Sequence, residues 1–247
     1  MQAATWFFRH WYWSNALIAA IAAITLVQMW SDMEVIQRIM LGQFIVINLH
    51  FVEEFRLPGG FPIIGNVVEM RSGTPSSYPL NQWNSWAGNN WFAFIVYLPA
   101  VIWYDQTWLT LSITVFGLLE FTMRWFGMSL LAKTWFNPGM ITAAIGCLPL
   151  SIIYLVHMYT DGPGIPGWTW IVAVLYPIAH YVVVFQLVLC KWLARRDTRF
   201  PFAPDEVDRG YRWIRNLDPA KLPTGVTNEP AYIRITGYTP IKENSLS

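Results

Sequence analysis

The sequence predicts an all-α fold: a polytopic membrane helix bundle of about six transmembrane helices, followed by an irregular cytoplasmic C-terminal tail. The 247 residues are 55% hydrophobic and only 13% charged, whereas soluble domains are about 25% charged. Apolar runs long enough to cross roughly 30 Å of hydrocarbon recur before residue 194. Residues 194–247 then hold nine of the 16 basic and seven of the 15 acidic residues. We therefore expect a transmembrane bundle over 1–193 and a soluble cytoplasmic tail over 194–247, packed on the bundle.

Six apolar segments are long enough to be spans, because a helix rises about 1.5 Å per residue. They lie near residues 11–30, 35–56, 90–104, 107–132, 139–159 and 168–193. The third is short, and we expect Pro99 to kink it. The first is longer than the apolar part of a signal peptide, and no small-x-small cleavage site follows it at Ser31-Asp32-Met33-Glu34. We therefore expect a retained first span.

Basic residues predict the orientation, because Lys and Arg are enriched in cytoplasmic loops. With the N-terminus inside, the inner segments hold Arg9, Arg56, Arg71, Lys133, Lys191, Arg195 and Arg196. The outer turns hold Asp32, Glu34, Asp105 and Asp161. Both termini are therefore expected in the cytoplasm.

The connection over 57–89 is rich in Gly, Pro, Ser and Asn, and a connection of this length is usually functional or mobile. We expect a re-entrant or amphipathic stretch over 61–70 that covers the inner mouth of the bundle, with a plain surface loop as the alternative.

Several classes of function are disfavoured by composition. The net charge of +1 gives no basic face for nucleic acid. Cys147 and Cys190 stand alone in apolar runs, which predicts neither a disulfide framework nor a zinc pair. The partners we expect are membrane lipids and an apolar small-molecule substrate, whereas the oligomeric state is left open.

Charged residues within apolar runs mark the candidate site. A charge at the centre of a membrane helix costs about 2.5–3.5 kcal/mol on insertion scales, so such residues usually face a protein interior. His50, Glu53 and Glu54 share one face at the end of span two, and the spacing leaves open which glutamate faces a pocket. Glu120 and Arg124 have the i, i+4 spacing of an ion pair in span four, at a similar depth. We expect these five residues to meet as acid/base groups, although Glu120 and Arg124 could equally form a structural pair.

Aromatic and polar side chains on spans four to six are candidates for substrate binding. Span six places His180 near mid-membrane, four residues after Tyr176 and beside Pro177. The full set expected to bind substrate is Phe121, Trp125, Trp135, Asn137, Tyr176 and His180.

One family resemblance follows from these residues. His50-x-x-Glu53-Glu54, followed by Phe136-Asn137-Pro138-Gly139 and Thr142, resembles the HXXEE-domain family of small integral membrane proteins over roughly residues 40–160. The family pattern has Tyr where this chain has Phe136, and its further histidine could only be His157 or His180 here. The layout is also similar, more weakly, to that of emopamil-binding sterol isomerases, which place a histidine and glutamates on neighbouring membrane helices.

Three hypotheses about function remain. The leading one is a membrane-embedded isomerase or cyclase that acts on a lipid or isoprenoid-type substrate in an inner-leaflet pocket, with no cofactor. Its acid/base groups are His50, Glu53, Glu54 and Glu120, with Arg124 fixing Glu120. The second is a metal-dependent hydrolase or oxidoreductase in which His50, Glu53, Glu54, Glu120 and His180 bind one Zn, Mn or Fe ion. The third is a proton-coupled transporter of small molecules or ions.

Overall fold

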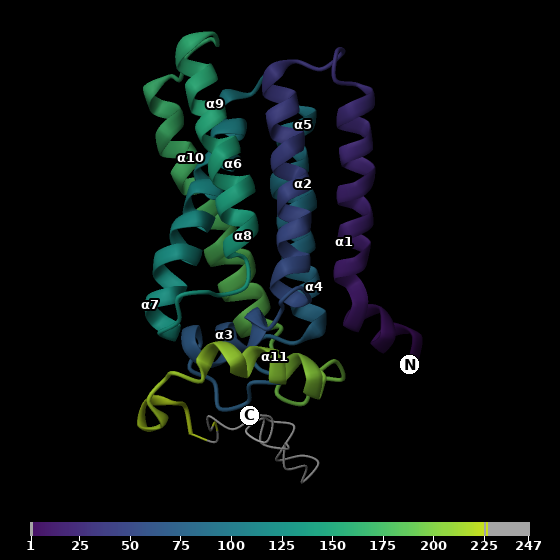
Figure 1. The fold of residues 1–247 in the computed structure, drawn as a ribbon, viewed down its shortest axis with the longest axis vertical. Helices are drawn as coiled ribbons and strands as arrows, with labels where there is room; N and C mark the ends of the chain where they lie inside the picture. The colour runs from purple at the N-terminus through teal and green to yellow at the C-terminus, as the bar shows by residue number, and fades with distance from the viewer. Residues whose placement is uncertain (1, 225, 227–247) are drawn as a thin grey trace, which may run out of the picture.

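The computed structural model describes residues 2–224 and 226, and within them every regular element is a helix. Six helical passes alternate in direction along one bundle axis (Figure 1). In chain order they are α1 (Gln2–Gln28); α2 (Val35–Phe55); α4 (Gln82–Trp91) with η2 (Phe92–Tyr97) and α5 (Leu98–Ile102); α6 (Thr107–Thr122) with η3 (Met123–Met128) and α7 (Ser129–Ala132); α8 (Met140–Thr142) with η4 (Ala143–Cys147) and α9 (Leu148–Thr160); and α10 (Gly167–Ala179) with η5 (His180–Trp192). The η segments within these passes are π-helical.

Five of these passes are long and apolar enough to cross a membrane, which makes the chain a multi-pass membrane protein. They are Ala3–Gln28, Val35–Phe55, Thr107–Ala132, Met140–Thr160 and Gly167–Trp192. The expectation of about six spans is therefore approximately right. The remaining pass covers most of the expected span 90–104, but its helix already begins at Gln82 with the polar segment α4 and ends at Ile102. α1 also begins well before the expected residue 11.

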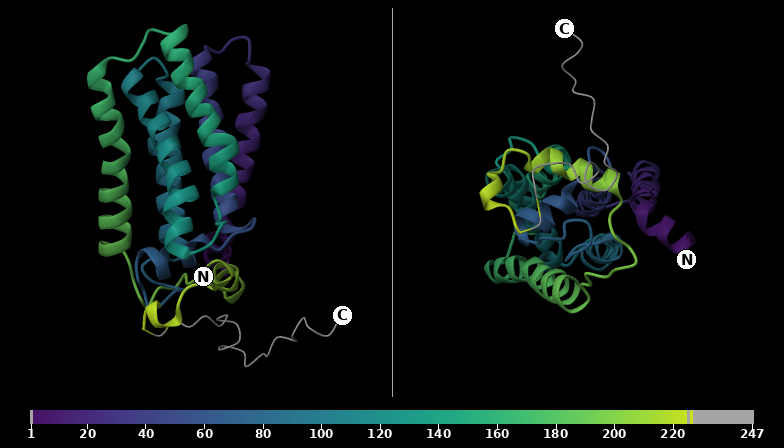
Figure 2. Two further views of the ribbon diagram at one scale, coloured as in Figure 1. Left: turned by 60° about the vertical axis from the view of Figure 1, so that its left-hand side comes forward. Right: turned by 90° about the horizontal axis from the view of Figure 1, so that it is seen from below.

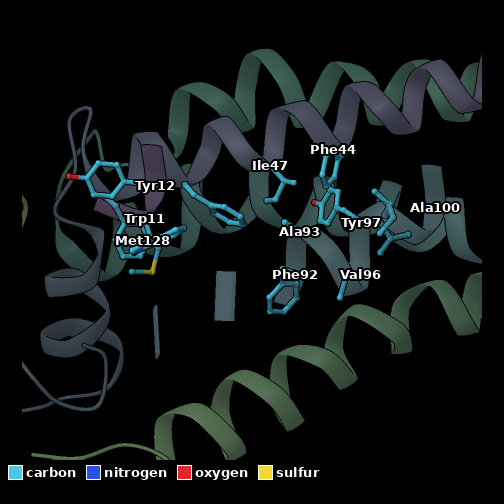
Figure 3. Close-up of a cluster of buried hydrophobic side chains, with 14 of the residues drawn as sticks. Trp11, Tyr12, Phe44, Ile47, Phe92, Ala93, Val96, Tyr97, Ala100 and Met128 are labelled. Atoms are coloured by element: carbon cyan, nitrogen blue, oxygen red, sulfur yellow. The ribbon is translucent and has the colours of Figure 1, made fainter. Parts of the chain in front are cut away.

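The helix α2 lies at the centre of the bundle and contacts α1, α5, α6 and α9. Of the residues in its most apolar window, 61% are buried, against 11% for Gly167–Trp192 at the edge of the bundle. Figure 3 shows Phe44 and Ile47 of α2 beside Tyr97 of η2, within a buried apolar cluster that continues to Trp11 of α1. Since α2 carries the candidate motif, this packing fixes the motif in a buried position.

The two short elements at the end of the bundle nearer the N-terminus are α3 (Phe61–Ile64) and α11 (Pro204–Ile214), as Figures 1 and 2 show. α3 continues into the π-helical η1 (Gly65–Glu69), so residues 61–70 form a buried helical piece at this end. α11 packs on α3 so closely that a Cβ on Gly60, whose φ is +97°, would lie 2.6 Å from the amide nitrogen of Gly210. The indole Nε1 of Trp213 also donates a 2.9 Å hydrogen bond to the carbonyl of Gly59.

Beyond α11, the short 3₁₀ turn η6 (Pro219–Lys221) completes the described elements. The expected tail over 194–247 therefore includes α11, and its part beyond residue 226 lies outside the described residues.

Candidate functional site

The two glutamates of the motif have different partners. Glu53 reaches the first turn of the fifth pass: its Oε1 accepts the amide of Ile141 at 3.0 Å, and its Oε2 accepts the amide of Thr142 at 2.8 Å. The first amides of a helix have no partner within the helix, and a carboxylate there is favoured by the helix dipole. Glu53 therefore fastens α2 to the start of α8.

A hydrogen-bond chain orients His50. The hydroxyl of Thr142 donates to Glu53 Oε2 at 2.5 Å, with the carbonyl of Gly139 as a longer alternative at 3.4 Å. The same hydroxyl oxygen lies 2.7 Å from Nδ1 of His50. Because its only hydrogen is used elsewhere, it accepts from Nδ1–H, so in the neutral imidazole the unprotonated nitrogen is Nε2. Glu53 thus acts on His50 through Thr142.

Glu54 belongs to a second, charged group. Arg124 donates from Nη2 to Glu54 Oε1 and from Nε to Glu120 Oε2, the latter at 3.3 Å. Nε2 of His50 lies 3.4 Å from Glu54 Oε1 and 3.6 Å from Glu120 Oε2. Within the described part of the chain this nitrogen has no hydrogen-bond partner, although the His50 residue is only 1% exposed. The arrangement therefore places Nε2 beside two carboxyl groups, within ion-pair distance of each when the imidazole is protonated.

The turn before α8 holds Arg124 in place. The side-chain amide of Asn137 donates to the carbonyl of Arg124 at 2.7 Å, and the Pro138 carbonyl lies 3.5 Å from Arg124 Nη1. Gly139 has φ +98°, and a Cβ there would lie 2.6 Å from Cε1 of His50. A glycine is thus required both by the backbone conformation and by the close approach to the imidazole.

Phe61 of α3 covers the guanidinium from the end of the bundle. The Arg124 Cζ lies 3.9 Å from the centre of the Phe61 ring, a cation–π contact. The short helix α3 is therefore one wall of the site.

Two cavities meet at this charged group. The inner cavity, of about 90 Å³, is lined by His50 and Glu54. The lateral cavity, of about 260 Å³, lies against the sixth pass at Pro177 and Ile178. Residues that line both are Phe61, Glu69, Phe116, Glu120, Arg124 and Tyr181. The acid/base group is thus reached from a mostly apolar space between η3 and α10–η5.

Three residues that form the far wall, or hold it in place, were not among the expected site residues. Tyr181 donates a hydrogen bond to Glu69 Oε1, and Gln186 donates to Tyr181 Oη at 2.8 Å and to Glu69 Oε1 at 3.4 Å. Glu69 lies in η1 and the other two lie in η5, so the contact depends on how the 57–81 connection folds back. The available signal was a glutamate within a stretch expected to cover the bundle mouth.

The structure brings together four of the five expected acid/base residues, and Glu53 contributes indirectly. None of the six residues expected to bind substrate lines the inner or the lateral cavity. Asn137 positions Arg124, and Trp125 donates to the Met140 carbonyl at 3.3 Å. Phe121 packs on Trp125, and Trp135 is 88% exposed.

His180 does not join His50. Its Nδ1 accepts a hydrogen bond from the Trp91 indole at 3.1 Å, and its ring packs on Tyr176, with 4.6 Å between ring centres. The five residues of the metal hypothesis therefore do not converge. Among the described residues, no group of three or more His, Cys, Asp or Glu side chains has the arrangement of a metal site.

Comparison with known proteins identifies one relationship. No curated protein and no solved structure matches this chain. Nothing found supports the weaker similarity to emopamil-binding sterol isomerases. The sequence model of one family, described as "Protein of unknown function with HXXEE motif", matches residues 41–154. These residues include His50, both motif glutamates, the Glu120–Arg124 pair and Thr142. The matched region therefore carries the charged group and the chain that orients His50, whereas Pro177, Ile178 and Tyr181 of the lateral cavity lie outside it.

Proposed function

We propose that this protein is a membrane-embedded enzyme of the isomerase or cyclase type, which moves a proton on an apolar lipid or isoprenoid-type substrate. The observation that carries the proposal is the buried Nε2 of His50, which lies 3.4 Å from Glu54 Oε1 and 3.6 Å from Glu120 Oε2 at the meeting point of two cavities. Moving a double bond requires one group that adds a proton to carbon and another that removes one. His50 and Glu120 can fill these two roles.

The other residues support this pair. Arg124 holds Glu120 and Glu54 in place, and Thr142 fixes the imidazole so that Nε2 faces the carboxyl groups. Glu53 holds Thr142 in turn. Preorganised groups of this kind lower the barrier because little rearrangement is needed during reaction. When a proton lies on one member of the His50–Glu120 pair, that member is the donor and the other is the acceptor.

Deuterium transfer tests the proposal even while the substrate is unidentified. Protein in nanodiscs would be incubated in heavy water with a total isoprenoid and lipid extract, and the products would be separated and weighed by mass spectrometry. We expect a lipid that gains carbon-bound deuterium. Acid/base groups contribute about 10²- to 10⁴-fold, so His50→Gln should lower incorporation by that factor. His157→Gln is the control: this histidine lies at the end of the fifth pass far from Thr142, and its replacement should leave deuterium incorporation unchanged.

Two outcomes would contradict this function. Flux of a small molecule or ion across reconstituted vesicles, without any labelled product, would favour a proton-coupled transporter instead. If protein purified without chelators held near-stoichiometric metal, and His50→Ala lost it, the metal-dependent hypothesis would be favoured over the metal-free one.

We also propose that both termini face the cytoplasm, so that the site opens in the inner leaflet. The N-terminus and α11 lie at the same end of the bundle (Figure 1). Arg71 and Arg195 lie outside the five spans, and Arg9, near the start of the first span, pairs with Asp205 of α11; basic residues at such positions favour the cytoplasmic side. Reporter fusions at residue 1 and within 161–166 should report opposite sides. A cytoplasmic signal from the 161–166 fusion would reverse the orientation.

A further inference from the structure

The lateral cavity has a polar wall and a lipid-facing side. Of its lining residues, Leu119 is 37% exposed, Met123 48% and Ile178 44%, all on passes that are long and apolar enough to cross a membrane. Opposite the His50 group, Glu69, Tyr181 and Gln186 form a connected hydrogen-bond cluster. Gln186 itself is not a lining residue, but it holds the two that are. A lipid could therefore enter sideways, with a polar head placed against this wall.

The hydrogen-bonding groups of this wall select the kind of head. In the described part of the chain, both hydrogen bonds to Glu69 go to Oε1, which leaves Oε2 able to accept another. The hydroxyl of Tyr181 already donates its single hydrogen to Glu69, so its oxygen can only accept. The wall thus offers acceptors, and a ligand head must donate.

The charge of the lining points the same way. The two cavities are lined by three carboxyl groups, of Glu54, Glu69 and Glu120, and by two groups that can carry positive charge, the Arg124 guanidinium and the His50 imidazole, both of which lie against Glu54 and Glu120. Arg124 is already paired with Glu54 and Glu120, so it offers no free positive charge to an anion. An anionic head would be placed beside Glu69 in an apolar space, where uncompensated charge is costly.

We propose that the lateral cavity binds a lipid whose head donates hydrogen bonds and carries no negative charge, with the head held by Glu69 and Tyr181. A long-chain alcohol or amine meets this requirement, and a phosphorylated lipid does not. The proposal rests on the proposed function only in taking this lipid to be the substrate that reaches His50.

Three probes with one tail test it: farnesol, farnesylamine and farnesyl phosphate, each measured by native mass spectrometry of the protein released from nanodiscs. We expect the alcohol and the amine to bind and the phosphate to bind at least tenfold more weakly. The tighter of these two probes shows whether the site prefers a hydroxyl head or an amine head. Farnesyl phosphate that binds as tightly as farnesol would overturn the proposal.

Variants locate the binding to this wall. The loss of one hydrogen bond of about 0.5–1.5 kcal/mol corresponds to roughly two- to tenfold in affinity. Tyr181→Phe should weaken farnesol binding by this factor, and the matched change Tyr159→Phe on the exposed face of α9 should not. Glu69→Gln should reduce the difference in binding affinity between farnesylamine and farnesyl phosphate. The proposal would also be overturned if the two tyrosine changes weakened farnesol binding equally, or if Glu69→Gln left the affinity difference between farnesylamine and farnesyl phosphate unchanged.

Binding and chemistry fail separately in these experiments. His50→Gln should keep the order of the three probes while it loses deuterium incorporation. Selective binding without any incorporation in the wild-type protein would overturn the proposed function and leave this inference standing. Deuterium incorporation without any preference among the three probes would overturn this inference and leave the proposed function standing.

Discussion

His50 and His180 each lie in an apolar helical pass, yet their surroundings differ in every physical respect. His50 is buried on the central helix, and two other passes supply its neighbours: Glu120 and Arg124 lie on the fourth pass and Thr142 on the fifth. His180 lies on the least buried pass and contacts mainly the rings of Trp91 and Tyr176. A histidine in a membrane helix therefore becomes a candidate catalytic group through the helices packed against it, more than through its depth.

The strongest way to break the His50 region is to remove its only guanidinium. Arg124→Met leaves Glu54 and Glu120 uncompensated, and breaking a buried ion pair from one side costs about 3–5 kcal/mol. The apparent free energy of unfolding in detergent should fall by about this amount. Lys191→Met, an exposed change in η5, should have almost no effect.

A rescue variant separates charge from packing. Arg124→Met combined with Glu54→Gln and Glu120→Gln should recover much of the stability, since no buried charge is then left alone. If the triple variant is as unstable as Arg124→Met, the loss comes from the volume and cation–π contact of the arginine.

A pair of glycines sharpens the contrast between tight and open regions. Gly139 and Gly164 both have positive φ, at +98° and +81°, so an alanine costs about 1–2 kcal/mol of backbone strain at either position. Only Gly139 meets side chains, whereas a Cβ at Gly164 would have nothing within 4 Å. Gly139→Ala should therefore destabilise by about 1–3 kcal/mol more than Gly164→Ala. Thermal unfolding of the two variants in one detergent measures this difference, and equal shifts would contradict it.

The orienting chain from Glu53 to His50 should affect activity more than stability. Thr142→Val removes the hydroxyl that fixes Nδ1–H, and the loss of a hydrogen bond of about 1 kcal/mol corresponds to roughly a fivefold fall in rate. Deuterium incorporation into lipid should fall by this factor. Thr122→Val, an exposed change at the last residue of α6, is the control. An equal fall in the control would show that hydroxyl removal acts through the membrane rather than through His50.

The smallest expected effect lies outside the membrane passes, where α11 packs on the bundle. Burial raises the pKa of Glu206, whose Oε2 accepts from Gln82 Nε2 at 2.7 Å and from the Ala203 amide at 2.6 Å. A raised folded-state pKa adds stability at pH values below the ordinary pKa of 4.5, and this stability is lost as the pH rises through the folded value. Burial alone would also raise the pKa of neighbouring Asp205, but pairing with Arg9 and Arg209 lowers it overall, so its contribution has the opposite sign.

Hydrogen exchange over residues 204–214 separates these two contributions. After correction for intrinsic exchange, the protection of wild-type α11 minus that of Glu206→Gln should decrease as the pH is raised from about 4 to 7. A difference that stays constant over this range would mean that the Glu206 carboxyl does not titrate in a shifted environment.

Much of the charged group could be predicted from spacing. Intervals of three and four residues placed His50 with the motif glutamates and Glu120 with Arg124, and similar depth placed the two pairs together. Spacing could not separate Glu53 from Glu54, because both lie on the face of α2 that carries His50. Which glutamate joins the charged group depends on the first amides of α8, because Glu53 binds Ile141 and Thr142, which lie 88 and 89 residues after it in the chain.

The far wall of the cavities could not be predicted in this way. Glu69 lies within the connection over 57–89, whose sequence has no helical periodicity of its own. Tyr181 and Gln186 lie in a π-helical segment, where the side-chain direction departs from the α-helical interval. The substrate-binding residues expected on spans four to six were selected because they are aromatic or polar, since the sequence does not show which side chains face a cavity. Helix packing placed other side chains at the two cavities.

The contact between Glu53 and the first amides of α8 also has a consequence for biosynthesis. Ribosomes deliver the chain from its N-terminus, so the second pass enters the bilayer with His50 and both glutamates before residues 140–142 have been made. Until then the imidazole has no hydroxyl to hold it and Glu53 has no amides to bind. The centre can therefore assemble only when the fifth pass inserts, and nascent chains that stop short of it must carry these polar groups through the membrane without their partners.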